Sequence, residues 1–333
     1  MDFPRINVYL NKLTHNAKII SGRFASRGIT AVAVTKSVLG DTRIARSIGH
    51  SGIENFGDSR LKNLIRLAGQ YRHSQLILLR SPMESEIETM VGVCATSLNT
   101  QIETVEKIDK ECAAQNRSHN IIVMVETDDS REGLLPGQVL PFIKKASFLD
   151  NIHILGLGTN ARCISKKKPS YGSLSLLPRL QREAEKVTGR KIPVLSGGNS
   201  SLYTLLLEGK IPAEINQVRI GEAIMLGHET LNYLPISGTY GSCFLLEGQI
   251  IEVKAGGKKA ILALGSQDGS ASNLLAEEGV EVLGQSSDHT VVGSKNQKRF
   301  CIGDIISFKM DYIGLLSAMT SPFVKKNYIA GIV

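Results

Sequence analysis

The chain has 333 residues, of which 42% are apolar and 21% are charged, and its formal net charge is +8. This length allows two domains with a sizeable core, and the composition is that of an ordinary globular protein. The first residues carry no apolar signal core, and no apolar run is long enough to span a bilayer. We therefore expect neither a leader nor a membrane segment.

The cysteines and the basic residues are both scattered along the chain. The five cysteines include no CxxC pair, so the sequence predicts neither a disulfide framework nor a metal site, and it fits a reducing cytoplasm. The chain has no Trp, and no basic stripe alternates with aromatic residues. We interpret the positive charge as a solvated surface and expect no nucleic-acid partner.

Over the first two thirds of the chain, short apolar segments alternate with helical ones. Strands are predicted at residues 31–36, 52–56, 75–79, 93–98, 121–126, 152–158, 192–195 and 215–220, with helices at 42–50, 59–69, 84–91, 101–115, 136–148, 174–188 and 200–209. This alternation indicates βα units and a parallel sheet. Eight units in about 200 residues suit a (β/α)8 TIM barrel, with an open doubly wound sheet as the alternative.

The pattern changes after residue 228. A linker rich in Gly, Pro, Thr and Tyr is followed by strand-like segments at 244–254, 259–264, 280–284, 290–292 and 304–310, separated by turns such as Gln267-Asp268-Gly269-Ser270. We predict a barrel domain over residues 1–228 and a smaller, mostly antiparallel β domain over 229–333. The first few residues are expected to pair with the β domain.

Polar residues stand at the ends of the predicted barrel strands. The first strand ends in Lys36, a costly place for a charge unless the amine is used. The carboxyl ends of all barrel strands meet on one face, where barrel enzymes carry their active sites. Lys36 is therefore a candidate to form a Schiff base with a carbonyl compound.

Two loops on the same face have the features of a phosphate site. The loop Ser196-Gly197-Gly198-Asn199-Ser200-Ser201 offers backbone amides and hydroxyl donors, and a helix follows it. The turn Arg219-Ile220-Gly221 ends the eighth strand, and barrels often bind phosphate after strands seven and eight. A plain helix cap is the alternative. An imine-forming lysine beside a phosphate site suggests pyridoxal phosphate.

These motifs resemble those of the alanine racemase-type pyridoxal phosphate enzymes, and among them the ornithine racemase group. The likeness covers nearly the whole chain and is carried by Val34-Thr35-Lys36, Arg131-Glu132-Gly133, Gly158-Thr159-Asn160, Val218-Arg219-Ile220-Gly221-Glu222 and Ser286-Ser287-Asp288-His289, among others. It implies an amino-acid racemase that works by two-base proton transfer at Cα.

The resemblance also implies roles for individual residues. Lys36 would hold the cofactor and act as one base, Arg219 would face the pyridine nitrogen, Arg131 the phenolic oxygen, and Asn160 would lie beside the ring. The phosphate would be held by the Ser196–Ser201 loop, including Asn199 and Ser200, and by Gly221 and Glu222. Ser287, Asp288 and His289 would reach the substrate across a homodimer.

Three questions stay open at this level. The tyrosine that alanine racemases supply as the opposing base has no match, so Tyr312, His289, Tyr240 and Cys163 are candidates, with Tyr312 preferred. The substrate is expected to be ornithine or another basic amino acid, facing acids among Asp58, Glu126, Asp128 and Asp129, or Asp268 and Asp288 of a partner subunit. The alternatives are a cofactor-homeostasis protein without turnover, and a decarboxylase or aldolase of the same fold.

Overall fold

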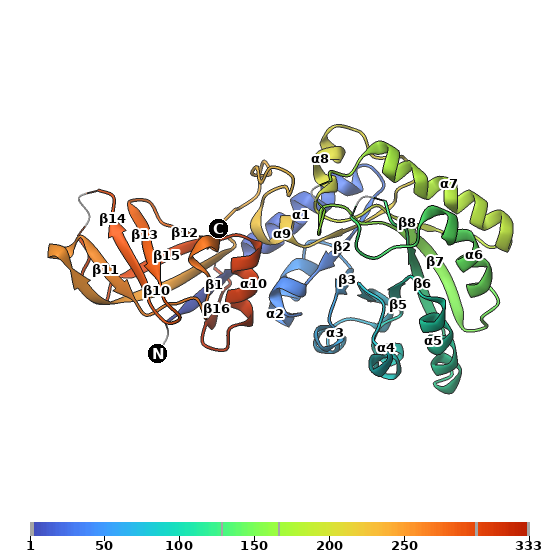
Figure 1. Cartoon of the computed structure of the whole chain (residues 1–333), viewed down its shortest axis with the longest axis horizontal. Coiled ribbons are helices and arrows are strands. Elements are labelled where there is room, and N and C mark those ends of the chain that lie inside the picture. Colours follow the sequence, from blue (N-terminus) through green and yellow to red (C-terminus); the bar gives the residue numbers. More distant parts are fainter. Residues whose placement is uncertain (1–2, 128, 166, 297–298, 332–333) are drawn as a thin grey trace.

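The computed structural model describes residues 3–127, 129–165, 167–296 and 299–331 and consists of a barrel joined to a smaller β domain (Figure 1). In the described part of the chain the barrel is closed by parallel strands in sequence order: β2 (Thr30–Val34), β3 (Asn55–Asp58), β4 (Leu76–Leu78), β5 (Thr96–Asn99), β6 (His119–Met124), β7 (Ile152–Gly158), β8 (Val194–Ser196) and β9 (Gln217–Ile220). The register Ala33↔Ile220 closes the ring. The barrel predicted from the sequence is confirmed, and the open sheet is excluded.

Helices surround this barrel because each connection between parallel strands must cross from one end of the sheet to the other. They are α1 (Leu10–Ala25), α2 (Thr42–Gly49), α3 (Leu61–Ala68), α4 (Ile87–Val93), α5 (Ile102–Ala114), α6 (Pro136–Ala146), α7 (Tyr171–Thr188), α8 (Leu202–Leu207) and α9 (Glu222–Leu226). Three short 3-10 turns, η1 (Lys36–Val38), η2 (His73–Gln75) and η3 (Glu84–Glu86), lie in the loops. A continuous apolar cluster packs the helices against the strands.

The β domain is built on the long strand β10 (Phe244–Lys254). The sheet order is β12 (Leu274–Ala276), β15 (Ile305–Met310), β10, β11 (Lys259–Leu262), β14 (Thr290–Ser294) and β13 (Val280–Gln285), with η4 (Ala255–Gly257) and η5 (Ala271–Asn273) in the turns. The predicted antiparallel sheet is thus confirmed. The sequence did not predict β12, β16 (Lys325–Ile329) or the helix α10 (Tyr312–Thr320).

The two ends of the chain join the domains. β1 (Arg5–Tyr9) pairs antiparallel with β10 and parallel with β16, so the first residues belong to the sheet of the β domain. Figure 1 shows α10 between this sheet and the barrel, and α10 packs against η1, the turn that begins with Lys36. The β domain therefore borders the carboxyl end of β2. None of the described helices is long and apolar enough to cross a membrane.

Candidate active site

Lys36 lies at the carboxyl end of β2, where the sequence predicted it. The preceding Thr35 donates a hydrogen bond from its hydroxyl to Asp58 Oδ2 at 2.7 Å, and Asp58 also accepts from the Arg60 amide and from Asn63. These bonds tie the ends of β2 and β3 together and fix the start of η1. The Lys36 side chain is exposed and, among the described residues, makes no ion pair. Its amine is thus free to react.

Arg219 occupies the centre of the site and is only 4% exposed. Its Nη2 donates to the Thr159 carbonyl at 2.6 Å and to Asn160 Oδ1 at 2.7 Å, while Nη1 donates to Ser196 Oγ. Among the described residues no carboxylate lies within ion-pair distance of Arg219. Burial lowers the pKa of the guanidinium to about 10, so it stays protonated at neutral pH.

Arg131 stands at the rim, in the loop that follows β6. Its guanidinium pairs with both carboxylate oxygens of Glu132 and lies 3.7 Å from Asp129 Oδ2. Glu132 in turn accepts a hydrogen bond from Asn160 Nδ2 at 3.0 Å. A continuous chain of polar contacts therefore runs from Arg131 through Glu132 and Asn160 to Arg219. The sequence analysis quoted Glu132 within a motif but did not name it as a site residue, although a carboxylate directly after a predicted cofactor arginine is a usable signal.

The loop after β8 is held in place by its own side chains. Asn199 donates to the Ala161 carbonyl at 2.9 Å and to Cys163 Sγ at 3.3 Å, and its Oδ1 accepts from the Ser201 amide at 2.9 Å. The Ser200 hydroxyl accepts a hydrogen bond from the Ala223 amide at 3.3 Å, which joins this loop to the start of α9. The two predicted phosphate loops are thus in direct contact.

Gly221 allows β9 and β2 to approach closely at this point. A Cβ atom on Gly221 would lie 3.1 Å from both the Cβ and the carbonyl oxygen of Val34. The turn after β9 therefore lies against the end of the strand that leads to Lys36. Glu222 starts α9, and its Oε1 lies 3.1 Å from His228 Nε2. The loops after β2, β8 and β9 consequently converge on one end of the barrel.

Tyr312, the preferred opposing base, is the first residue of α10 and lies beside Ser37 of the same chain. The Ser37 hydroxyl is close enough to affect the phenol, but the two make no hydrogen bond of good geometry. Burial raises the pKa of Tyr312 above its usual value, and Ser37 opposes this only in part. The phenol is therefore protonated at neutral pH.

Cys163 also lies among the charged groups of the mouth, in the loop after β7. Its backbone amide donates to Asp129 Oδ1 at 2.8 Å, and desolvation raises the pKa of its thiol while Arg131 opposes the rise.

The other two candidates for the opposing base lie elsewhere. His289 belongs to the β13–β14 turn, and the Tyr240 ring packs on His15 of α1 with centroids 5.1 Å apart.

The predicted substrate-binding residues Ser287, Asp288 and His289 form the turn between β13 and β14. Asp288 and His289 are 64% and 45% exposed, and the contacts of Asp288 are with Ser286, Ser287 and His289 of the same turn. The described contacts therefore do not bring this turn to Lys36 of its own chain.

Most of the acids expected to face a basic substrate prove to be structural. Glu126 accepts hydrogen bonds from the amides of Asp129, Ser130 and Arg131, and Asp129 accepts from those of Cys163 and Ile164. Asp58 is fully buried, and Asp268, at 6% exposure, accepts from the Gly265 amide. Asp128 lies outside the described residues. The contacts of the described carboxylates stabilise the loops, and they do not support a role for these groups in binding a substrate amine.

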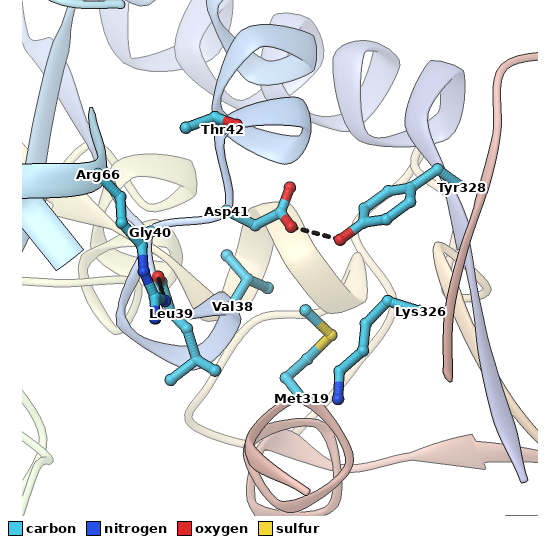
Figure 2. A pocket seen from close by; sticks show the side chains of 9 residues that line it. All are labelled: Val38, Leu39, Gly40, Asp41, Thr42, Arg66, Met319, Lys326 and Tyr328. Atoms are coloured by element: carbon cyan, nitrogen blue, oxygen red, sulfur yellow. Dashed lines mark hydrogen bonds between the residues drawn. The ribbon is translucent and has the colours of Figure 1, made fainter. Parts of the chain in front are cut away.

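A cavity of about 480 Å³ lies beside this site, between the barrel and the β domain (Figure 2). Tyr328 of β16 reaches into it and donates a hydrogen bond to Asp41 at the start of α2. Of the described residues, those that line it are Val38, Leu39, Gly40, Asp41, Thr42, Arg66, Met319, Lys326 and Tyr328. Lys36 and Arg219 are not among them, so this cavity is distinct from the predicted cofactor site.

The family of the chain follows from comparison with known proteins. The family model described as alanine racemase, N-terminal domain, matches residues 8–229. This combination of barrel and β domain is the architecture of alanine racemase from Clostridium difficile, with a TM-score of 0.78 at 16% identity, covering 99% of this chain and 97% of that one. The chain belongs to the alanine racemase family.

Two curated relatives match along their full length. The chain is 33% identical to ornithine racemase from Acetoanaerobium sticklandii, over 98% of this chain and 100% of that protein. It is 34% identical to lysine racemase from Thermotoga maritima, over 98% and 99%. The D-threonine aldolase of Filomicrobium marinum shares only the fold, with a TM-score of 0.78 at 11% identity, over 96% of this chain and 88% of that one. The predicted enzyme class, an amino-acid racemase of the alanine racemase type, is confirmed.

Proposed function

We propose that the protein interconverts the L and D forms of a basic amino acid, ornithine or lysine, with pyridoxal phosphate as its cofactor. The full-length similarity to an ornithine racemase and a lysine racemase carries this proposal. The aldolase likeness is one of fold alone, and a homeostasis protein of the single-domain type would lack the β domain. The first alternative therefore rests on fold alone, and the second leaves the β domain unexplained.

The residues present fit the cofactor. Arg219 is a buried cation without a carboxylate at ion-pair distance in the described structure, which is a costly state unless a ligand supplies an acceptor. Within the described residues the Ser37 and Ser201 hydroxyls are buried without a hydrogen-bond partner. One adjoins Lys36 and the other lies in the predicted phosphate loop. The cofactor would offer acceptors to these donors.

In the proposed mechanism, bound pyridoxal phosphate supplies the electron withdrawal that makes the substrate Cα proton acidic. Lys36 would hold the cofactor through its amine and would act as the base that takes the Cα proton on one face. Arg219, which stays protonated, would donate a hydrogen bond to the pyridine nitrogen and so disfavour protonation of that nitrogen. Ser200, Asn199 and the turn at Gly221 would hold the phosphate.

Tyr312 is proposed as the group that exchanges a proton on the opposite face. Its raised pKa keeps the phenol protonated, so it is prepared to donate a proton while Lys36 accepts one. In the reverse direction Lys36 donates and Tyr312 accepts. Among the predicted acids in the described part of the chain, Asp288 of a partner subunit is exposed on its turn and could approach the substrate.

Borohydride reduction followed by peptide mapping tests the cofactor assignment. We expect the wild-type protein to carry pyridoxal phosphate covalently on Lys36, and Lys36→Ala to carry none and to lose racemisation. Lys191→Ala is the matched control, because the Lys191 side chain is 90% exposed and, among the described residues, its ion pair is with Glu185 at 3.5 Å. Reduction products on another lysine would contradict the assignment of Lys36.

The substrate is tested with single L-amino acids whose D products are scored by chiral chromatography. We expect ornithine and lysine to be converted faster than alanine or serine. An exposed charge pair contributes only ~0.2–1 kcal/mol, so strong selectivity requires the substrate amine to be held away from bulk water. Faster turnover of alanine than of ornithine would show that the basic substrate class is wrong while leaving the racemase class intact.

A further inference from the structure

Glu132 differs from the other acids at the barrel mouth in what it contacts. Glu126 and Asp129 accept backbone amides and thereby shape loops. In the described structure, by contrast, Glu132 is bonded to side chains, those of Arg131 and Asn160, and it is 29% exposed. A carboxylate that shapes no turn but links two predicted cofactor residues is best explained by a role in the site itself.

The contacts of Asn160 have a fixed direction. An amide side chain donates only through its nitrogen and accepts only through its oxygen. Because Asn160 Nδ2 donates to Glu132 Oε1 at 3.0 Å, its Oδ1 faces Arg219 Nη2 at 2.7 Å. If the amide were reversed, its oxygen would face a carboxylate and its nitrogen would face a guanidinium. The Glu132 carboxylate therefore determines that the oxygen of the Asn160 amide, and not its nitrogen, faces Arg219.

Arg131 completes the arrangement from the other side. Its guanidinium pairs with both oxygens of Glu132, a two-point contact that restricts the rotation of the carboxylate. Arg219, buried and without a carboxylate at ion-pair distance among the described residues, depends on its neutral acceptors: Thr159 O, Asn160 Oδ1 and Ser196 Oγ. The orientation of one of these acceptors, the Asn160 amide, is thus set by Glu132 and, through Glu132, by Arg131.

We propose that Glu132 is a positioning residue that, anchored by Arg131, holds the Asn160 amide in the orientation that Arg219 needs to present its guanidinium to the cofactor. The proposal rests on the proposed function, since Arg219 is taken to face the pyridine nitrogen. Glu132 itself touches neither cofactor nor substrate in this scheme; it acts through Asn160.

Glu132→Gln tests this in the whole protein. A glutamine has one acceptor oxygen, and its other terminal atom is an NH2 group that only donates. One of the contacts with Arg131 or Asn160 would therefore bring two donor groups together. We expect the dissociation constant of pyridoxal phosphate, measured by equilibrium dialysis of the cofactor-free protein, to rise about tenfold or more, the scale of one lost hydrogen bond to a charged group. The pH at which the absorption of the bound cofactor changes should also shift.

The same substitution in an Asn160→Ala background separates positioning from other effects. If Glu132 acts through Asn160, Glu132→Gln adds less than about twofold to the dissociation constant once the amide is gone. A purely structural role would instead lower the melting temperature of the cofactor-free protein with little change in cofactor affinity. Glu132→Asp, which keeps the charge, should recover part of the loss.

Glu214→Gln is the control, because Glu214 precedes β9 at the opposite end of the barrel and pairs with Arg182 at 3.5 Å on the surface. It should leave unchanged the dissociation constant of pyridoxal phosphate, the pH of the absorption change and the melting temperature of the cofactor-free protein. Wild-type affinity in Glu132→Gln, or an undiminished effect in the Asn160→Ala background, would overturn the proposal. A wild-type protein that binds no pyridoxal phosphate would instead overturn the proposed function, so the two failures are distinguishable.

Discussion

At the scale of single residues, the role proposed for Arg219 is the most specific. A guanidinium beside the pyridine nitrogen keeps that nitrogen unprotonated, which limits charge delocalisation into the ring. We expect Arg219→Glu to allow protonation, so that racemisation falls while products of the transamination half-reaction rise. Both are measured by chiral chromatography and cofactor absorption, with Arg219→Lys as the charge-conserving control. If a folded Arg219→Glu protein showed an unchanged ratio of racemisation to transamination, Arg219 would have only a packing role.

A second residue-scale prediction concerns His119 at the start of β6. Its Nε2 lies 2.9 Å from Ser97 Oγ, and burial lowers the pKa of the imidazole from 6.5 to about 3. The unfolded chain therefore binds a proton that the folded chain rejects, so this contribution to stability is full above pH 6.5 and is lost as the pH falls toward 3. Urea unfolding at pH 7 and pH 5 should show a smaller loss on acidification in His119→Asn than in the wild type. An equal loss would mean that His119 is not the group that titrates.

At the scale of elements, Asp41 joins the two domains a few residues after Lys36, the proposed catalytic lysine. Its Oδ1 accepts the amides of Arg43 and Ile44 and caps α2, while its Oδ2 accepts the hydroxyl of Tyr328 on β16. Tyr328→Phe keeps the ring under the Arg43 guanidinium but removes this hydrogen bond, and should lower the free energy of unfolding by about 1–3 kcal/mol. Asp41→Ala should cost more, because the helix cap is lost as well. Both free energies of unfolding are measured by denaturant titration. Equal losses in the two variants would show that the helix cap adds nothing to the contribution of the Tyr328 hydrogen bond.

The elements also show what the sequence could and could not predict. Barrel strands such as β2, β4 and β6 were predictable because they contain short apolar runs that polar residues follow, and Lys36 was visible as a charge just after β2. β16 has the sequence Lys-Lys-Asn-Tyr-Ile and no apolar alternation, and its pairing with β1 spans almost the whole chain, so no local pattern indicates it. The position of Glu132 directly after Arg131 was visible in the sequence, but its contact with Asn160 depends on where the loops after β6 and β7 meet, which the sequence does not specify.

At the scale of the whole molecule, the described contacts leave the predicted substrate-binding turn away from Lys36 of its own chain. The turn with Ser287, Asp288 and His289 is exposed, and the described contacts of Asp288 lie within that turn. Large apolar side chains such as Leu275, Leu283, Ile302 and Phe323 are also exposed on the β domain. We propose a homodimer in which this turn enters the active site of the partner subunit.

Mixed dimers test this arrangement. Lys36→Ala and Asp288→Ala chains, each carrying a different affinity tag, are expected to be inactive or at least tenfold impaired alone. If the active sites are shared, a mixed dimer contains one site with both residues intact, so random assortment should restore about a quarter of the wild-type racemisation rate. Sites built within one chain would gain nothing from mixing. A fully active monomer in sedimentation and kinetics at matched concentrations would refute the dimer altogether.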